Sequence, residues 1–254
     1  MTTLTRDPIV IFIFTFAVMW ASAWVGTRLR RMRRVANDAE REDLGTIKSA
    51  SLTLLALLIG FTFSMAVGRY DQRKNYEEAE ANAIGTEYLR ADLLQAADAA
   101  HLRQLLKAYV NQRILFYTTA DAHQLDQVTA STSALERDLW SAVRLSATAQ
   151  PSPITALVIS GMNDVLNSEG YTHAAWWNRI PFAAWLLMII IAIACNTMVG
   201  YDTHQVNGRF RVVFILPAIV AVSFFLIADM ESPRRGVIRV VPENLMSLAN
   251  SMTQ

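Results

Sequence analysis

Four long runs of uncharged, mostly apolar residues divide the chain. Three of them, 8–27, 49–68 and 180–199, are 20 residues long, and the fourth, 212–228, has 17 residues before Asp229. A bilayer core of about 30 Å requires about 20 helical residues, with about 17 as a lower limit. Because only a helix satisfies its own backbone hydrogen bonds in lipid, the pattern predicts four transmembrane helices, the fourth over 212–230.

A segment of different character separates the second run from the third. Residues 69–179 contain ten basic and thirteen acidic side chains. Their apolar positions recur every three or four residues, which predicts helices. One stripe comprises Leu125, Val128, Thr132, Leu135, Leu139, Ala142 and Ser146, and a second comprises Ile154, Leu157, Val158, Gly161, Met162, Val165 and Leu166. The expected fold is all-α: four transmembrane helices, an extramembrane helical bundle over 69–179, and a C-terminal tail over 231–254.

Local signals suggest where the helices of this segment begin and end. Ser152 before Pro153 is a good N-cap, and Asp121 with Gln124 is a weaker one. The stretch from Arg69 to Tyr117 has no proline, so the second transmembrane helix is expected to continue into it, with a break near Asp98. A turn is expected at 167–170, in the sequence Asn-Ser-Glu-Gly.

The second run carries a stripe of small residues that suggests close helix contact. Small side chains spaced by four lie on one helical face and let another backbone approach. The stripe could pack against a neighbouring helix of the same chain, or it could lie at the axis of an oligomer and line a pore. In the pore interpretation, nearby apolar residues form a constriction that gates by dewetting. The stripe is Ala56, Gly60, Ser64 and Gly68, and the candidate constriction is Phe61, Phe63 and Met65.

Charged residues follow this run directly. In a symmetric oligomer their carboxylates would form rings at a pore mouth that favour cations. The alternative is a solvated helix face with pairs such as Arg73–Glu77. The candidate pore-mouth charges are Arg69, Arg73, Glu77, Glu80 and Glu87.

Composition narrows the function classes. The chain is 53% hydrophobic and 18% charged, which is typical of a membrane protein with a polar part. A net charge of +1 argues against a nucleic-acid partner, and the one cysteine, Cys195, excludes an intrachain disulfide. The histidines show no metal-ligand spacing, and no nucleophile or phosphate-loop motif occurs. We therefore expect no enzyme, no metal and no cofactor, and the expected partners are lipid, further copies of the chain and an inorganic ion.

Polar residues in or beside the third and fourth runs have simpler interpretations. Asn196 and Cys195 are expected to be packing residues, and Asp229 and Glu231 to be anchors at the membrane edge. The distribution of charges does not fix the orientation in the membrane. The basic cluster between Arg28 and Arg34 favours a cytoplasmic first loop and both termini outside.

Three segments resemble a known family. The sequence LLALLIGFTFSMAVGRYD at 54–71, EANAIGTEYLRADLL at 80–94 and SPRRGVIRV at 232–240 together resemble the bestrophin-like family of bacterial membrane proteins, a domain family of unknown function. In the last segment, Pro233, Gly236 and Arg239 belong to the tail that the family shares.

The resemblance implies a channel-like architecture. Bestrophins are pentameric chloride channels with four spans per subunit and a helical domain between the second and third, the order expected here. No counterpart of the bestrophin neck motif with its Ser-Pro is recognised, so chloride selectivity is not implied. Bestrophins keep both termini cytoplasmic, opposite to the indication of the basic cluster. The expectation is a homo-oligomeric, channel-like, multi-pass protein of the inner (plasma) membrane; the alternative is a non-conducting sensor or scaffold whose helical segment binds a ligand or partner.

Overall fold

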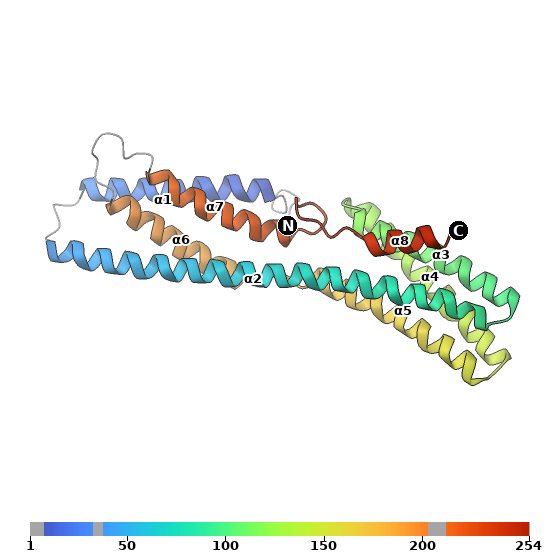
Figure 1. The fold of residues 1–254 in the computed structure, drawn as a ribbon. Coiled ribbons are helices and arrows are strands. Elements are labelled where there is room, and N and C mark those ends of the chain that lie inside the picture. Colours follow the sequence, from blue (N-terminus) through green and yellow to red (C-terminus); the bar gives the residue numbers. More distant parts are fainter. Residues whose placement is uncertain (1–7, 33–37, 203–211, 254) are drawn as a thin grey trace. The chain divides into compact units, whose positions relative to one another are not determined.

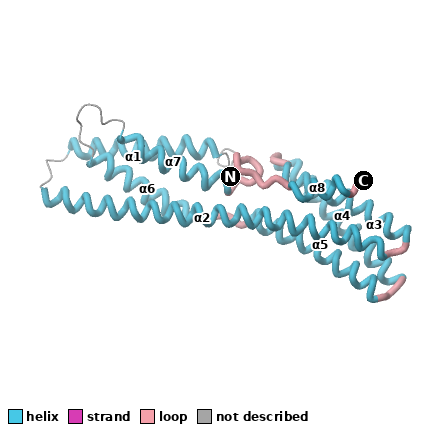
Figure 2. Tube along the Cα trace, in the orientation of Figure 1, coloured by secondary structure: helices cyan, strands magenta, loops and turns pink. Residues whose placement is uncertain are grey.

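A computed structural model describes residues 8–32, 38–202 and 212–253, and every regular element in them is helical (Figures 1 and 2). The all-α fold class is therefore confirmed. Arg33, Arg34 and His204 lie outside the described residues. The helices are α1 (Pro8–Met32), α2 (Asp38–Arg90), α3 (Ala96–Thr118), α4 (Ala122–Ala149), α5 (Pro153–Trp177), α6 (Phe182–Asp202), α7 (Val212–Met230) and α8 (Glu243–Ser251), with a 3₁₀ turn at Ala91–Leu93.

The apolar runs all lie in helices, but they differ in length. Three described helical stretches, Pro8–Met32, Glu42–Leu93 and Pro153–Asp202, are long and apolar enough to cross a membrane. The fourth, Phe214–Met230, is a shorter apolar helix. The protein is thus a helical membrane protein, and the fourth crossing stays a prediction.

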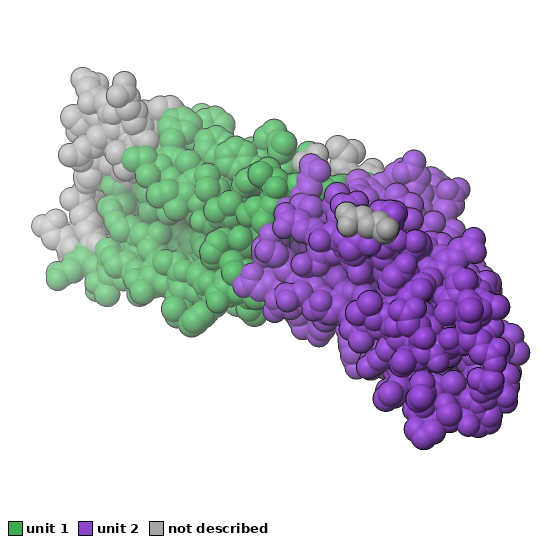
Figure 3. Space-filling view, turned by 45° about the vertical axis from the view of Figure 1, so that its right-hand side comes forward, with its two compact units in different colours: residues 1–68, 179–238 green, residues 69–178, 239–254 purple. Residues whose placement is uncertain are grey.

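The chain forms two compact units (Figure 3). The membrane unit comprises residues 1–68 and 179–238, and the helical unit comprises 69–178 and 239–254. Figure 1 shows α2 as one uninterrupted helix, and its residues are shared between the two units. The predicted tail is likewise divided, because 231–238 group with the membrane unit and 239–254 with the helical unit.

In the membrane unit, α1 packs closely against α6 through two glycines. A Cβ added at Gly26 would overlap the carbonyl oxygen of Thr197, and one at Gly200 would overlap that of Ala23. The backbones therefore touch, as in small-residue contacts between transmembrane helices. This contact was not among the predicted packing faces. Beside it lies an apolar cluster that joins α1, α2, α6 and α7 and consists of Met19, Leu55, Met188, Ala192, Cys195, Val220 and Phe224.

Asp229 and Glu231 tie the chain after α7 to the membrane unit. The backbone amides of Val237 and Ile238 donate to the Asp229 carboxylate at 2.8 and 2.7 Å. The Ile180 amide donates to Glu231 Oε2 at 2.9 Å. Both side chains are buried and fix the segment after α7 through these bonds; a role as anchors at the membrane edge stays a prediction.

The helical unit has its own core, in which both predicted stripes take part. From α4, Val128, Thr132, Leu139 and Ser146 are buried. From α5, Val158, Gly161, Met162 and Val165 are buried, whereas Ile154 and Leu157 are exposed. The stripes meet apolar residues of α3 such as Leu102 and Leu106.

The predicted N-caps are confirmed. Ser152 Oγ accepts the Thr155 amide at 3.1 Å, and Asp121 Oδ1 accepts the Gln124 amide at 2.9 Å. The break after the long helix falls at Ala91–Leu93, several residues before Asp98.

The turn predicted at 167–170 is wrong, because α5 continues to Trp177. Packing outweighs the local turn preference there. Ser168 is buried with its hydroxyl bonded to the Val165 carbonyl at 2.6 Å, and Glu169 pairs with Arg113 of α3 at 3.4 Å.

Candidate functional site

The small-residue stripe of α2 is an open face of the membrane unit. Ala56, Gly60, Ser64 and Gly68 are all exposed, whereas the opposite side of the helix, with Leu55, Thr62 and Ala66, is buried. A Cβ added at Gly60 or Gly68 would meet nothing within 4 Å. Among the described residues, the stripe therefore does not serve as a contact with another helix of the same chain.

The three residues of the candidate constriction divide between two environments. Phe61 and Met65 lie on the open face and are 61% and 45% exposed. Phe63 is half-buried and packs on the cluster of Ala66, Ile180, Ile227 and Met230. Phe61 and Met65 therefore share the exposed side of α2 with the stripe, whereas Phe63 packs in the core of the membrane unit. A constriction role for any of the three stays a prediction.

The candidate pore-mouth charges are mostly inside the helical unit. Arg69 is half-buried, and Arg73, Glu77, Glu80 and Glu87 are buried. The alternative of a solvated helix face does not describe the last four side chains, because they are buried. The partners of Arg73, Glu77 and Glu80 come from distant parts of the chain, and a role at a pore mouth stays a prediction.

Arg73 and Glu77 each form hydrogen bonds with backbone groups at the end of another helix. Arg73 Nε donates to the Ala175 carbonyl at 3.2 Å, and its Nη2 donates to the Asn178 carbonyl at 3.3 Å. Both carbonyls lie at the C-terminal end of α5. Glu77 accepts the Leu245 amide at 2.9 Å and the Asn244 side chain at 2.7 Å, at the first turn of α8. A cation at a C-terminus and a carboxylate at an N-terminus also suit the helix dipole.

Glu80 is the acceptor at the centre of a buried polar network. Arg113 of α3 donates to both of its oxygens, and Tyr117 and Thr172 each donate to Oε2 at 3.0 Å. Arg113 also pairs with Glu169 at 3.4 Å. Burial, followed by the nearby Glu80 charge, raises the pKa of Tyr117 well above its usual range, so this phenol is a permanent donor at neutral pH.

Glu87 differs from these three. Its side chain is fully buried, yet within the described structure neither carboxylate oxygen accepts a hydrogen bond. Arg90 Nη1, the cation paired with it, is 3.8 Å away.

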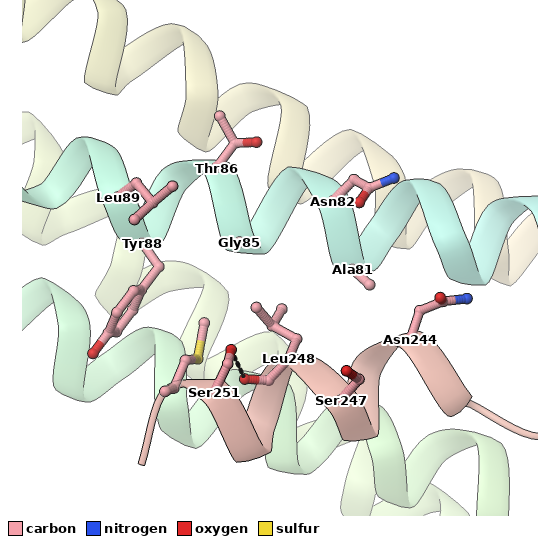
Figure 4. A pocket seen from close by; sticks show the side chains of 11 residues that line it. Ala81, Asn82, Gly85, Thr86, Tyr88, Leu89, Asn244, Ser247, Leu248 and Ser251 are labelled. Atoms are coloured by element: carbon pink, nitrogen blue, oxygen red, sulfur yellow. Dashed lines mark hydrogen bonds between the residues drawn. The ribbon is translucent and has the colours of Figure 1, made fainter. Parts of the chain in front are cut away.

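A polar groove lies between α2 and α8 in the helical unit (Figure 4). Its volume is about 620 Å³. The lining offers amides and hydroxyls but no charged group, and Ser251 Oγ donates to the Leu248 carbonyl at 2.8 Å. The lining residues are Ala81, Asn82, Gly85, Thr86, Tyr88, Leu89, Asn244, Ser247, Leu248, Ser251 and Met252. Among the described residues, no three His, Cys, Asp or Glu side chains come close enough together to hold a metal ion.

The shared tail packs tightly at the end of α7. Pro233 and Gly236 are buried, and Arg239 is exposed. A Cβ at Gly236 would lie 2.7 Å from the Asp229 carbonyl oxygen and 2.8 Å from Asp229 Oδ1. Glycine is therefore required for the two amides beyond it to reach the Asp229 carboxylate. Gly236 of the tail motif therefore has a structural role.

Comparison with curated proteins found no match, whereas several solved structures share this architecture. Among solved structures, a variant of a bacterial bestrophin homologue from Klebsiella pneumoniae is 17% identical, covers 95% of this chain and 96% of its own, and superposes with a TM-score of 0.64. The same homologue phased with zinc is 16% identical, with 94% and 98% coverage and a TM-score of 0.63.

A third structure, described only as a membrane protein variant, is 14% identical, with 94% and 98% coverage and a TM-score of 0.65. At such identities these likenesses show the fold alone. The model of the Bestrophin-like domain matches residues 13–245, nearly the whole chain. The resemblance seen in the sequence is thereby confirmed, and the chain belongs to the Bestrophin-like family.

Proposed function

We propose that this protein is a homo-oligomeric, channel-like component of the inner membrane, in which ions pass along an axis lined by the membrane part of α2. The observation that carries the proposal is the open face of that helix. Its small residues, together with Phe61 and Met65, are left uncovered by the chain's own helices in the described structure. Family membership supports the same class of function.

The open face combines two properties that suit a permeation path. The small residues Gly60, Ser64 and Gly68 are exposed and leave the backbone accessible, which permits close approach of other subunits around an axis. Phe61 and Met65 add bulky apolar side chains four residues apart, on one side of the helix. A ring of such side chains closes a pore to water unless it widens.

The test is ion flux into liposomes that contain the purified full chain. Phe61→Ala should raise the flux, because it removes bulk from the proposed constriction. Phe14→Ala is the matched control, since Phe14 lies on α1 and is 70% exposed; it should leave the flux unchanged. Phe63→Ala is less informative because Phe63 also packs in the core.

Two outcomes would overturn the proposal. One is a protein that stays strictly monomeric both in mild detergent and in lipid. The other is the absence of flux from protein that copurifies with a stoichiometric partner, which would favour the sensor or scaffold instead.

A further inference from the structure

Glu87 is a buried carboxylate at the contact between α2 and α5. Its side chain is fully buried, and it faces Gly161 of α5. A Cβ added at Gly161 would overlap both Glu87 Oε2 and Arg90 Nη1. The absence of a side chain at position 161 therefore makes room for the carboxylate between the two helices.

The surroundings of Glu87 do not stabilise a negative charge well. Glu77 and Glu80 each accept hydrogen bonds of 2.9 or 3.0 Å from neighbouring helices, whereas no described group donates to Glu87. A buried ionised carboxylate without hydrogen bonds is costly, and protonation removes that cost. Two charged groups act on it: Arg90 on α2, which favours the anion, and Asp164 on α5, which opposes it.

The direction of the titration follows from this environment. Burial, opposed by Arg90 and aided by Asp164, raises the pKa of Glu87 from 4.5 to about 7. The group therefore changes charge in the range of ordinary cytoplasmic and periplasmic pH.

We propose that Glu87 is a proton-binding site that controls how firmly α2 packs on α5 in the helical unit. With the proton bound, the neutral carboxyl group is buried and the contact is closed. With the proton lost, the anion is stabilised by solvent and the contact opens more often. The proposal does not depend on whether the protein conducts ions.

The sign of the pH dependence is fixed by linkage. In an opened or unfolded state Glu87 titrates near its ordinary pKa of 4.5, and in the closed state near 7. The closed contact is therefore fully stabilised below about pH 4.5, and this stabilisation is lost as the pH rises toward about 7. Each unit of pKa difference changes the opening equilibrium tenfold, so the full effect is up to about 300-fold.

The experiment is hydrogen exchange on the full chain in lipid nanodiscs, corrected for intrinsic exchange rates. In the wild type, opening of the α5 segment around Gly161 should increase at least tenfold between about pH 5 and about pH 8. Glu87→Gln mimics the protonated group and should stay protected at both values. Glu78→Gln, an exposed carboxylate on the same helix, should keep the wild-type profile.

Two further variants test in which direction the pH of the opening transition moves, and they remain informative if Glu87→Gln folds poorly. Arg90→Gln removes the favourable cation and should move the transition to higher pH. Asp164→Asn removes the repelling anion and should move it to lower pH. An opening equilibrium of the wild type that does not change with pH, or a transition unaffected by both variants, would overturn the proposal.

Discussion

At the scale of single residues, the glycines of the membrane unit are not equivalent. Gly26 and Gly200 sit where helix backbones touch, whereas a Cβ at Gly45 or Gly60 would meet no atom within 4 Å. The first pair is therefore required by the packing of α1 on α6. Gly45 and Gly60 are not required by helix packing within the described chain, so Gly60 is available for contacts with another copy of the chain.

Gly200→Ala should destabilise the membrane unit. Its Cβ would overlap the Ala23 carbonyl, and such overpacking costs about 1–3 kcal/mol. Thermal unfolding in detergent measures the effect. Gly45→Ala is the control and should be neutral or slightly stabilising, because alanine favours helices. Equal melting temperatures for the two variants would contradict the close contact of α1 with α6.

The ion pair of Glu80 with Arg113 also belongs to this scale. Arg113→Met would leave a fully buried carboxylate without its cation and should cost about 3–5 kcal/mol of stability. Arg144→Met, at an exposed position of α4, should cost little. Chemical denaturation provides the comparison.

The double variant Arg113→Met with Glu80→Gln removes both charges. It should recover part of the stability that Arg113→Met loses, because no uncompensated charge remains. If the double variant were as unstable as the sum of the two single variants, the residues would not be coupled.

At the scale of elements, α8 is held by a carboxylate from a different helix. Glu77 lies on α2 and accepts an amide 168 residues away in the sequence. This is the role that an N-cap side chain ordinarily has from within its own helix. Docking of α8 therefore combines this bond from α2 with the burial of its own Leu245 in the core of the helical unit.

Glu77→Ala should loosen the first turn of α8. Loss of a capping acceptor costs about 0.5–2 kcal/mol, and the effect should be local, seen as faster protease cleavage near Leu245. Glu78→Ala, its exposed neighbour, serves as the control. If both variants were cleaved at the same rate, Glu77 would not hold α8.

The elements also show what a sequence can and cannot predict. The apolar runs, the Ser152 and Asp121 caps and the stripes of α4 and α5 depend on neighbours within a few residues, and they were predicted correctly. Glu80 pairs with residues 33 and 92 positions away. A pattern read along one helix shows the charge but not its partner, so these buried contacts could not be predicted.

The fully buried Glu87 illustrates the same limit. Its sequence context resembles that of the exposed Glu78, because both are glutamates of a long, charged helix. Only the packing of α5 against it, with Gly161 opposite, distinguishes the two. The one sequence signal for this contact is Gly161 itself, a glycine within a helical stripe. Glycine destabilises a helix interior, so its presence there suggests that something packs closely against it.

At the scale of the whole molecule, the open face of α2 predicts contact between copies of the chain. Ser64→Cys in a Cys195→Ala background should give covalent dimers in membranes with a bifunctional thiol reagent. Ile219→Cys on α7, which is 57% exposed, is the control and should give few. Similar yields at both positions would indicate random encounters and would contradict an axis at α2.

The continuity of α2 has a consequence for how this protein can vary. Arg73, Glu77 and Glu80 lie on one uninterrupted helix of 53 residues and bond to α5, α8 and α3 within the helical unit. The directions in which the three side chains point therefore depend only on the number of residues between them. Inserting a single residue between Arg73 and Glu77 would turn everything beyond it by about 100° relative to Arg73, so the three could not all keep their partners. Seven inserted residues would restore the rotation to within about 20° but would move Glu77 and Glu80 about 10 Å along the helix axis. Natural insertions or deletions should therefore be absent between these residues.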